Sequence, residues 1–307
     1  MDVGRRVGQA VIDSYRRATG NRLEVSLGDP DAILRAEVID ESFRLWLDAS
    51  GDRPLYRRGY RRQLHPASLR ASLAYLMLRL GDWRGEPLLD PMTGIGTIPI
   101  EAALYAHGVA PSSFRKHRFA IDRLVEDGPL AAAGRMVGEA ASLTGETAGG
   151  PLPLDDQGNG PHTRAALRYD EPLVADPGRV DVLGVERYEG HVQGAWLNLA
   201  GAGRPPGVRI EPGDAEYLEG LVEAKRYRLA VLNPPFGRRV GSTKIIRNLY
   251  RGFAQSAARC GVARVVTLAE SRTAMTESLE RGGYSVVGSR RVLYGELEAH
   301  VIIAELQ

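Results

Sequence analysis

The segment Asn233-Pro234-Pro235-Phe236 holds side chains that could act on a planar amino group. It follows the apolar run Leu229–Leu232, which predicts the end of a buried strand. Two prolines remove two backbone donors and fix φ, so the chain leaves the strand rigidly and presents Asn233 outward. Asn233 Oδ1 and the Pro234 carbonyl could then accept both hydrogens of an amine, while Phe236 stacks on the attached ring. The alternative interpretation is a proline-rich turn with a buried phenylalanine.

Such an arrangement would activate an amine. The exocyclic amine of a purine is a poor nucleophile because its lone pair is delocalised into the ring. Two acceptors that pull the N–H bonds out of the ring plane relocalise this lone pair toward an electrophile. The catalytic candidates are therefore Asn233, Pro234, Pro235 and Phe236.

A second informative segment runs from Leu88 into a Gly94-Ile-Gly96 turn and then an apolar helical pattern. Glycines let the backbone approach a ligand closely, and the helix N-terminus beyond offers free N–H groups. Pro99 stands where the third glycine of a dinucleotide-binding fingerprint would fall. The carboxylate of Asp90 at the strand end would repel a pyrophosphate and attract a cationic ligand. Together with Glu101, it favours S-adenosylmethionine over NAD as the cofactor.

Two further carboxylates follow predicted strands. Glu186 closes the apolar run that begins at Val180, and it is placed to accept ribose hydroxyls of a nucleoside cofactor. Asp214 follows the next strand and could accept an adenine amino group. Each carboxylate alone is as consistent with a solvated loop, but four polar strand ends in one chain are not expected by chance. The cofactor-binding candidates are Asp90, Pro91, Met92, Gly94, Gly96, Thr97, Glu186, Asp214, Ala215 and Asn233.

These residues require a sheet that brings strand ends together. The pattern predicts a doubly wound, Rossmann-like α/β domain with a mostly parallel sheet and an antiparallel last hairpin. Ligands bind outside the carboxyl ends of such strands, where all four polar residues fall. The predicted strands are Leu88–Asp90, Val180–Glu186, Val208–Ile210, Leu229–Asn233, Ala263–Ala269, Tyr284–Leu293 and His300–Leu306.

The chain resembles the class I methyltransferases and, more narrowly, the THUMP-linked RNA guanine-N2 methyltransferases. Within that family it is most similar to the archaeal tRNA guanine-N2 methyltransferases that act in the acceptor stem. The stretches that carry the resemblance are Leu55–Arg62 with His65–Leu69, Asp90–Ala103, Asn233–Gly237 with Lys244–Tyr250, and Tyr294–Ile303. They span nearly all of residues 53–307, and their joint order is specific.

The resemblance implies methyl transfer from S-adenosylmethionine to the N2 amine of a flipped guanine, with tRNA or another structured RNA as partner. Adenine-N6 and glutamine-N5 methyltransferases carry a similar Asn-Pro-Pro loop, so amine methylation of another substrate stays open. A third alternative is a non-catalytic RNA-binding subunit with a vestigial pocket.

The chain departs from this family's domain organisation in two places. Residues 1–52 are similar to the last part of a THUMP domain, with a helix over Val7–Ala18 and apolar-alternating segments at Leu23–Leu27, Ile33–Ile39 and Phe43–Leu47. Residues 53–307 form the expected methyltransferase domain. Residues 111–178 are a long insertion, for which we expect a helix over Phe119–Leu143 and a flexible stretch at 145–161.

Basic residues cluster although the net charge is only +2. Five arginines lie between Arg53 and Arg62, and a window from Ala224 to Arg251 contains eight basic residues and no acid. The second group flanks the Asn233 segment, where RNA phosphates would pass. The alternative is a solvated basic surface. The RNA-binding candidates are Arg57, Arg58, Arg61, Arg238, Arg239, Lys244 and Arg247.

The remaining composition limits the class of protein. Cys260 is the single cysteine, which excludes internal disulfides. The six histidines are scattered without zinc spacing, so we expect no metal. The sequence has no apolar run that would suggest a signal peptide or membrane span, which predicts a cytoplasmic protein with no membrane partner. We expect a monomer.

Overall fold

The computed structural model describes residues 3–28, 30, 32–51, 54–110, 113–114, 180–236, 243–294 and 297–307. The helix predicted over Phe119–Leu143 and the stretch 145–161 lie outside these residues. The chain divides into two compact units, Met1–Leu55 with Arg115–Gly160 and Tyr56–Phe114 with Pro161–Gln307. Each unit is described separately.

The first unit contains a helix and a hairpin. Helix α1 spans Val3–Thr19, and strands β1 (Leu34–Ile39) and β2 (Ser42–Leu47) pair antiparallel. The helix begins earlier than the predicted Val7, and the Leu23–Leu27 segment has no strand. All side chains of β1 and β2 are exposed. The assignment of residues 1–52 to a partial THUMP domain stays a prediction.

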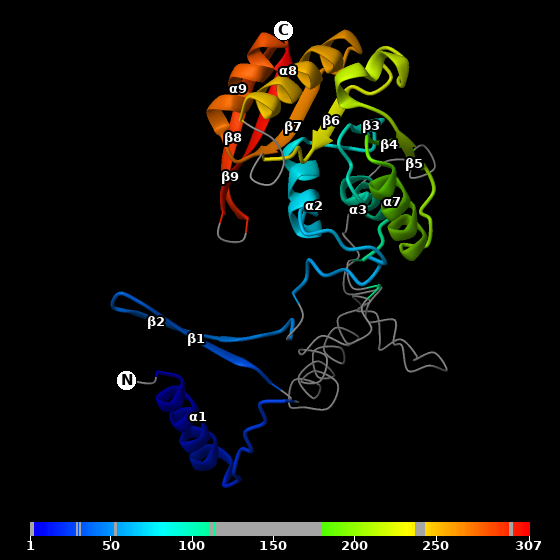
Figure 1. The fold of residues 1–307 in the computed structure, drawn as a ribbon. Coiled ribbons are helices and arrows are strands. Elements are labelled where there is room, and N and C mark those ends of the chain that lie inside the picture. The colour runs from blue at the N-terminus through cyan, green and yellow to red at the C-terminus, as the bar shows by residue number, and fades with distance from the viewer. Residues whose placement is uncertain are drawn as a thin grey trace, which may run out of the picture. The chain divides into compact units, whose positions relative to one another are not determined.

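The second unit is built on one seven-stranded sheet, with strand order β5-β4-β3-β6-β7-β9-β8 (Figure 1). Its elements in chain order are α2 Ala71–Leu80, β3 Leu88–Asp90, α3 Thr97–Ala106, β4 Val182–Glu186, α7 Glu189–Gly201, β5 Val208–Pro212, η2 Ala215–Gly220, β6 Leu229–Leu232, α8 Thr243–Arg259, β7 Arg264–Ala269, α9 Arg272–Arg281, β8 Tyr284–Tyr294 and β9 Leu297–Leu306. Strands β3 to β7 run parallel, and β9 is antiparallel to both β7 and β8. The predicted doubly wound sheet is therefore confirmed.

Every predicted strand of this sheet is present. The largest shift is in β9, which begins at Leu297 and not at His300. Strand β6 ends at Leu232, so Asn233 is the first residue beyond the strand. Within the described ranges, no helix is both long and apolar enough to cross a membrane.

Strands β3, β4 and β6 are buried along their whole length because both faces of the sheet are covered there. In β6, Ala230 and Leu232 pack with side chains of η2, α8 and α9. Leu229 and Val231 point to the other face and pack with α2 and α3. This alternation follows from the two-residue period of a strand. The two cores hold the sheet rigidly, so the residues at its strand ends have fixed positions.

The register of the sheet brings the polar strand ends to one edge. Strand β3 pairs with β4 on one side, with Asp90 opposite Gly184, and with β6 on the other, with Leu89 opposite Ala230. Strand β4 pairs with β5, with Glu186 opposite Pro212. Strands β4 and β5 lie on one side of β3, and β6 lies on its other side, so the strand order reverses at β3. Such a topological switch point is where α/β sheets bind ligands.

Candidate active site

Asp90 is the last residue of β3, and its side chain is buried. Its Oδ1 accepts a hydrogen bond from the Met92 N–H at 3.3 Å. Its Oδ2 is buried and has no hydrogen-bond partner among the described residues. Burial raises the pKa of Asp90 to about 8. The Thr93 hydroxyl and the Met92 N–H oppose this rise, and the nearby charge of Glu186 adds to it. A buried carboxyl with an unused oxygen is a binding group for a cation or donor.

The turn after β3 depends on two glycines. Gly94 has φ 55° and Gly96 has φ 83°, in the left-handed region that favours glycine. A Cβ on Gly96 would lie 3.1 Å from the Ala195 Cβ, so this glycine lets α3 approach α7 closely. A Cβ on Gly94 would meet nothing within 4 Å, so open space lies beside the turn. The first N–H groups of α3 receive no side-chain cap from Gly96, which leaves them to other acceptors.

Glu186 connects the end of β4 to this turn. Its buried side chain accepts from the Gly94 N–H at 2.8 Å through Oε2 and from the Tyr188 N–H at 3.0 Å through Oε1. His191 Nδ1 lies 3.4 Å from the same Oε1. These contacts hold the carboxylate beside Gly94. Oε2, which accepts one hydrogen bond, keeps a further lone pair for a ligand hydroxyl.

Asp214 caps the short helix after β5. Its Oδ1 accepts from the Glu216 N–H at 3.0 Å, and its Oδ2 lies 3.4 Å from Arg187 Nη1. The side chain is partly exposed, and the following Ala215 is buried. The helix cap fixes the orientation of this carboxylate at the same edge of the sheet as Glu186.

Asn233 directly follows β6 and is half-buried. Its Oδ1 is buried without a hydrogen-bond partner among the described residues. Pro234 is buried, and Pro235 is exposed. Phe236 is half-buried and packs against the core on the α2 and α3 side of the sheet. An acceptor without a partner in this position is suited to an incoming amine.

Tyr250 supports the Asn233 segment, and sequence reasoning gave it no role. It is a buried residue of α8, and its hydroxyl donates to the Pro235 carbonyl at 2.7 Å. Burial raises the pKa of this hydroxyl, so it stays protonated and remains a donor. A hydrogen bond to a backbone carbonyl has no sequence signature, and only the tyrosine at a buried helical position hinted at a role.

Arg58 requires a correction. The sequence placed it among the RNA-binding residues, but its guanidinium is buried and pairs with Glu101, with Nη2 and Oε2 3.0 Å apart. The Tyr60 hydroxyl donates to Glu101 Oε1 at 3.0 Å. An arginine that compensates a buried carboxylate cannot leave it for a phosphate without a large cost. Arg58 and Glu101 instead attach the segment before α2 to helix α3.

The other basic candidates differ in exposure. Arg61 is half-buried, and its Nη2 donates to the Leu69 carbonyl at 2.6 Å and to the buried Thr97 Oγ1 at 3.0 Å. Arg57 is exposed, as are Lys244 and Arg247 on α8. Arg238 and Arg239 lie outside the described residues. Arg57, Lys244 and Arg247 thus remain accessible to an RNA.

The polar groups at the carboxyl ends of these strands fit S-adenosylmethionine. Asp90 Oδ2 has no hydrogen-bond partner among the described residues, the Gly94 turn leaves room, and Glu186 and Asp214 offer acceptors on the adjacent strands. The described residues contain no cluster of three or more histidine, cysteine or acidic side chains that could hold a metal ion. Cys260 is buried in the core under α8, and burial raises the pKa of its thiol. The individual roles of these residues stay predictions.

The family and the relatives that this chain matches are all methyltransferases. Residues 58–300 match the family described as UPF0020, RMKL-like, methyltransferase domain. The chain is 31% identical over 306 residues to a tRNA (guanine(6)-N2)-methyltransferase of Archaeoglobus fulgidus, covering 99% of this chain and 65% of that protein. It is 29% identical to the protein of the same name from Methanocaldococcus jannaschii, covering 100% of this chain and 72% of the relative. The chain therefore spans only part of these relatives.

Two solved structures share the fold. The structure of SMU.472 complexed with SAH matches with a TM-score of 0.69 and 19% identity, over 98% of this chain and 69% of that one. TrmN from Thermus thermophilus matches with a TM-score of 0.61 and 22% identity, over 99% of this chain and 66% of that one. At these identities the likeness concerns the fold.

Proposed function

The chain belongs to the UPF0020 family of RMKL-like methyltransferase domains, and from this we propose that it methylates the N2 amine of a guanine in tRNA. S-adenosylmethionine, when bound, supplies the methyl group from its sulfonium. The names of the archaeal relatives support guanine N2 as the target and tRNA as the substrate.

The observation that carries the proposal is the buried Asn233 Oδ1 without a partner at the end of β6. Strand β6 is adjacent to β3, so Asn233 lies one strand away from the carboxyl of Asp90. A catalytic amide acceptor and a cation-binding carboxyl side by side are what amine methylation requires. Asn233 Oδ1 and Asp90 Oδ2 have no hydrogen-bond partner in the described part of the protein.

The cofactor side of the site divides among three strand ends. Asp90 offers its unused oxygen to the positively charged part of the cofactor. Glu186 accepts the ribose hydroxyls, and Asp214 with Ala215 receives the adenine ring. Pro91, Met92 and Thr97 complete the wall around the Gly94 and Gly96 turn. These roles follow the order of strands β3, β4 and β5 across the sheet.

The amine side of the site is formed by the segment after β6. Asn233 Oδ1 and the Pro234 carbonyl accept the two N2 hydrogens, and Phe236 stacks on the flipped base. Extruding a base costs about a few kcal/mol, and less where it is unpaired. Asn233 cannot act as a base, so the surplus proton passes to water after transfer. Positioning is therefore the main source of acceleration.

The Tyr250 hydroxyl holds this segment in place. We expect Tyr250→Phe to lower kcat about fivefold to tenfold, because it removes a hydrogen bond worth about 1 kcal/mol that orients the Pro235 carbonyl. Tyr284→Phe is a matched control, since the buried Tyr284 hydroxyl donates to the Val262 carbonyl at 2.9 Å. Val262 lies just before the amino end of β7, away from the carboxyl ends where Asn233 lies. The initial rate of methyl transfer to a tRNA transcript is measured for both variants. Equal rates for the two would show that the Tyr250 bond does not position the loop.

Adenine N6 and glutamine N5 are alternative targets of the same amine chemistry. The chain, methyl-labelled S-adenosylmethionine and unmodified tRNA transcripts should give labelled N2-methylguanosine after nuclease digestion. Label in N6-methyladenosine, or transfer only to a glutamine-containing peptide, would replace the guanine proposal. No transfer to any substrate with cofactor bound would favour the non-catalytic RNA-binding subunit.

The first unit has a separate part in the proposal. Residues 1–52 act as a partial THUMP-like RNA-binding segment, which is supported by the resemblance and by the basic helix α1, whose last turn carries Arg16 and Arg17. The cytoplasmic location and the monomeric state stay predictions.

A further inference from the structure

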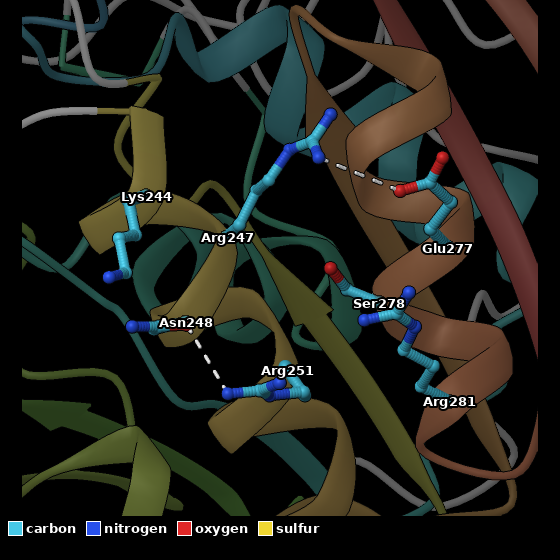
Figure 2. Close-up of a pocket in the computed structure, with 7 residues that line it drawn as sticks. All are labelled: Lys244, Arg247, Asn248, Arg251, Glu277, Ser278 and Arg281. Atoms are coloured by element: carbon cyan, nitrogen blue, oxygen red, sulfur yellow. Dashed lines mark hydrogen bonds and ion pairs between the residues drawn. The ribbon is translucent and has the colours of Figure 1, made fainter.

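A basic hollow lies on the outer surface between α8 and α9. Its volume is about 350 Å³. Helix α8 contributes four lining residues and α9 three. Figure 2 shows their side chains. The lining residues are Lys244, Arg247, Asn248, Arg251, Glu277, Ser278 and Arg281.

The basic residues of this hollow are poorly neutralised by the protein itself. Among the described residues, Lys244 and Arg281 have no acidic partner, and Arg251 donates only to Asn248 Oδ1 at 3.3 Å. Arg247 Nη1 lies 4.0 Å from Glu277 Oε2, and both side chains are about half exposed. Four cations thus face one carboxylate. An exposed pair at this distance contributes little to stability, so Arg247 is free to turn to another anion.

The sequence of α8 places these cations on one face. Positions 244, 247, 248 and 251 follow the helical spacing of three and four residues, so their side chains share the outer surface. The opposite face carries Ile246, Tyr250 and Phe253, which are buried in the core. Because Arg251 uses the oxygen of Asn248, the amide N–H groups of Asn248 stay available as donors.

Helix stability does not explain Lys244 at the start of α8. Lys244 lies in the first turn, where the helix dipole disfavours a cation. The dipole of α9 favours a cation at Arg281, which lies in the last turn of that helix. It does not explain why Arg281 lies close to α8. That approach depends on the neighbouring Gly282, at which a Cβ would lie 2.6 Å from the Ala254 Cβ. The close contact of the two helices brings Arg281 to the cations of α8.

We propose that this hollow binds the phosphodiester backbone of the RNA, next to the nucleotide held at Asn233. The inference rests on the proposed function and adds Asn248, Arg251 and Arg281 to the RNA-contacting residues. Helix α8 follows β6, so its Lys244 end lies at the carboxyl edge of the sheet and the hollow leads away from the active site. Lys244 and Arg251 are about 10 Å apart along the helix axis, which accommodates more than a single phosphate. Guanidinium groups suit phosphates because they bind their oxygens in pairs.

The test is the salt dependence of tRNA binding by the whole chain. Arg251→Gln combined with Arg281→Gln should weaken binding of an unmodified tRNA transcript. It should also reduce the slope of log affinity against log salt by about one unit for each lost phosphate contact. Arg204→Gln with Arg228→Gln is a charge-matched control. Both arginines are exposed, and they precede β5 and β6, at the amino ends of the parallel strands. The control should keep the wild-type slope, and both double variants should bind S-adenosylmethionine like the wild type.

Glu277→Gln tests the same hollow in the opposite direction. Removing the single carboxylate should tighten tRNA binding and steepen the salt slope, and a destabilised fold cannot produce this result. Wild-type slopes in both the arginine double variant and Glu277→Gln would overturn the inference, as would equal losses in the two arginine double variants.

Labelling of N2-methylguanosine by the wild-type chain separates this inference from the proposed function. Normal labelling with an unchanged slope in the Arg251 and Arg281 variant contradicts the hollow alone. A reduced slope without any labelled N2-methylguanosine supports the hollow and contradicts the methylation proposal. Binding of inorganic phosphate that is lost in the variant, together with an unchanged tRNA slope, would assign the hollow to a free anion and overturn its role in RNA binding.

Discussion

Replacing Asn233 with alanine is expected to lower the rate of methyl transfer to tRNA by about 100-fold or more, a loss comparable to removal of one preorganised catalytic hydrogen-bonding group. Alanine removes the amide acceptor that relocalises the amine lone pair. The fold should be unaffected, because Asn233 Oδ1 has no hydrogen-bond partner among the described residues. Single-turnover rates with saturating cofactor measure the effect on chemistry, and calorimetric titration confirms that the cofactor still binds.

Asn233→Asp is the informative companion variant. Its side chain has the same shape and keeps an acceptor oxygen, so we expect it to retain more activity than Asn233→Ala. Near-wild-type turnover by Asn233→Ala, with cofactor bound, would contradict the catalytic role of Asn233.

Replacing Asp90 with asparagine should weaken binding of S-adenosylmethionine in a manner that depends on pH. Burial raises the pKa of Asp90 to about 8, so the carboxyl is mostly protonated at neutral pH and becomes charged as pH rises. If the charged form binds the cationic cofactor, the ratio of wild-type to Asp90→Asn affinity should rise about tenfold between pH 7 and pH 9. Taking the ratio removes the titration of the cofactor itself. Calorimetry at several pH values gives both affinities, and a ratio that stays constant would contradict the role of Asp90.

The same shift has a consequence for stability. Because the pKa of Asp90 in the folded state exceeds its usual value of 3.8, the wild-type protein loses stability relative to Asp90→Asn as pH rises from about 4 to about 8. Thermal unfolding without cofactor should therefore favour Asp90→Asn increasingly over this range. A stability difference that stays the same at pH 5 and pH 9 would show that this carboxyl does not titrate in that window.

The sheet and its polar edge could be predicted from the sequence because buried parallel strands are apolar throughout. The run Val182–Glu186 ends in a carboxylate, and Leu229–Leu232 is followed directly by Asn233. The parallel topology then brings these polar residues to the same end of the sheet. The start of β9 was less predictable. Glu298 pairs with the exposed Leu293 beyond the core, and such ribbon ends lack the alternation that marks a buried strand.

The contacts that the sequence did not predict come from distant segments. Arg58 and Glu101 are 43 residues apart, and only packing of the segment before α2 on α3 buries them together. The Tyr250 bond ends on a backbone carbonyl, which any residue provides. The hollow needs Arg281, which close packing of α9 on α8 brings beside the α8 cations. A run of arginines therefore does not reveal which member is structural and which binds RNA.

The most direct test of the proposed function removes the target atom from the RNA. After labelling identifies the methylated guanosine, a tRNA with inosine at that single position keeps the ring and loses the N2 amine. We predict that the wild-type chain transfers no label to this tRNA, although the tRNA still binds and S-adenosylmethionine affinity is unchanged. Continued transfer of label to the inosine nucleotide would contradict methylation of guanine N2 and the role of Asn233 as an amine acceptor.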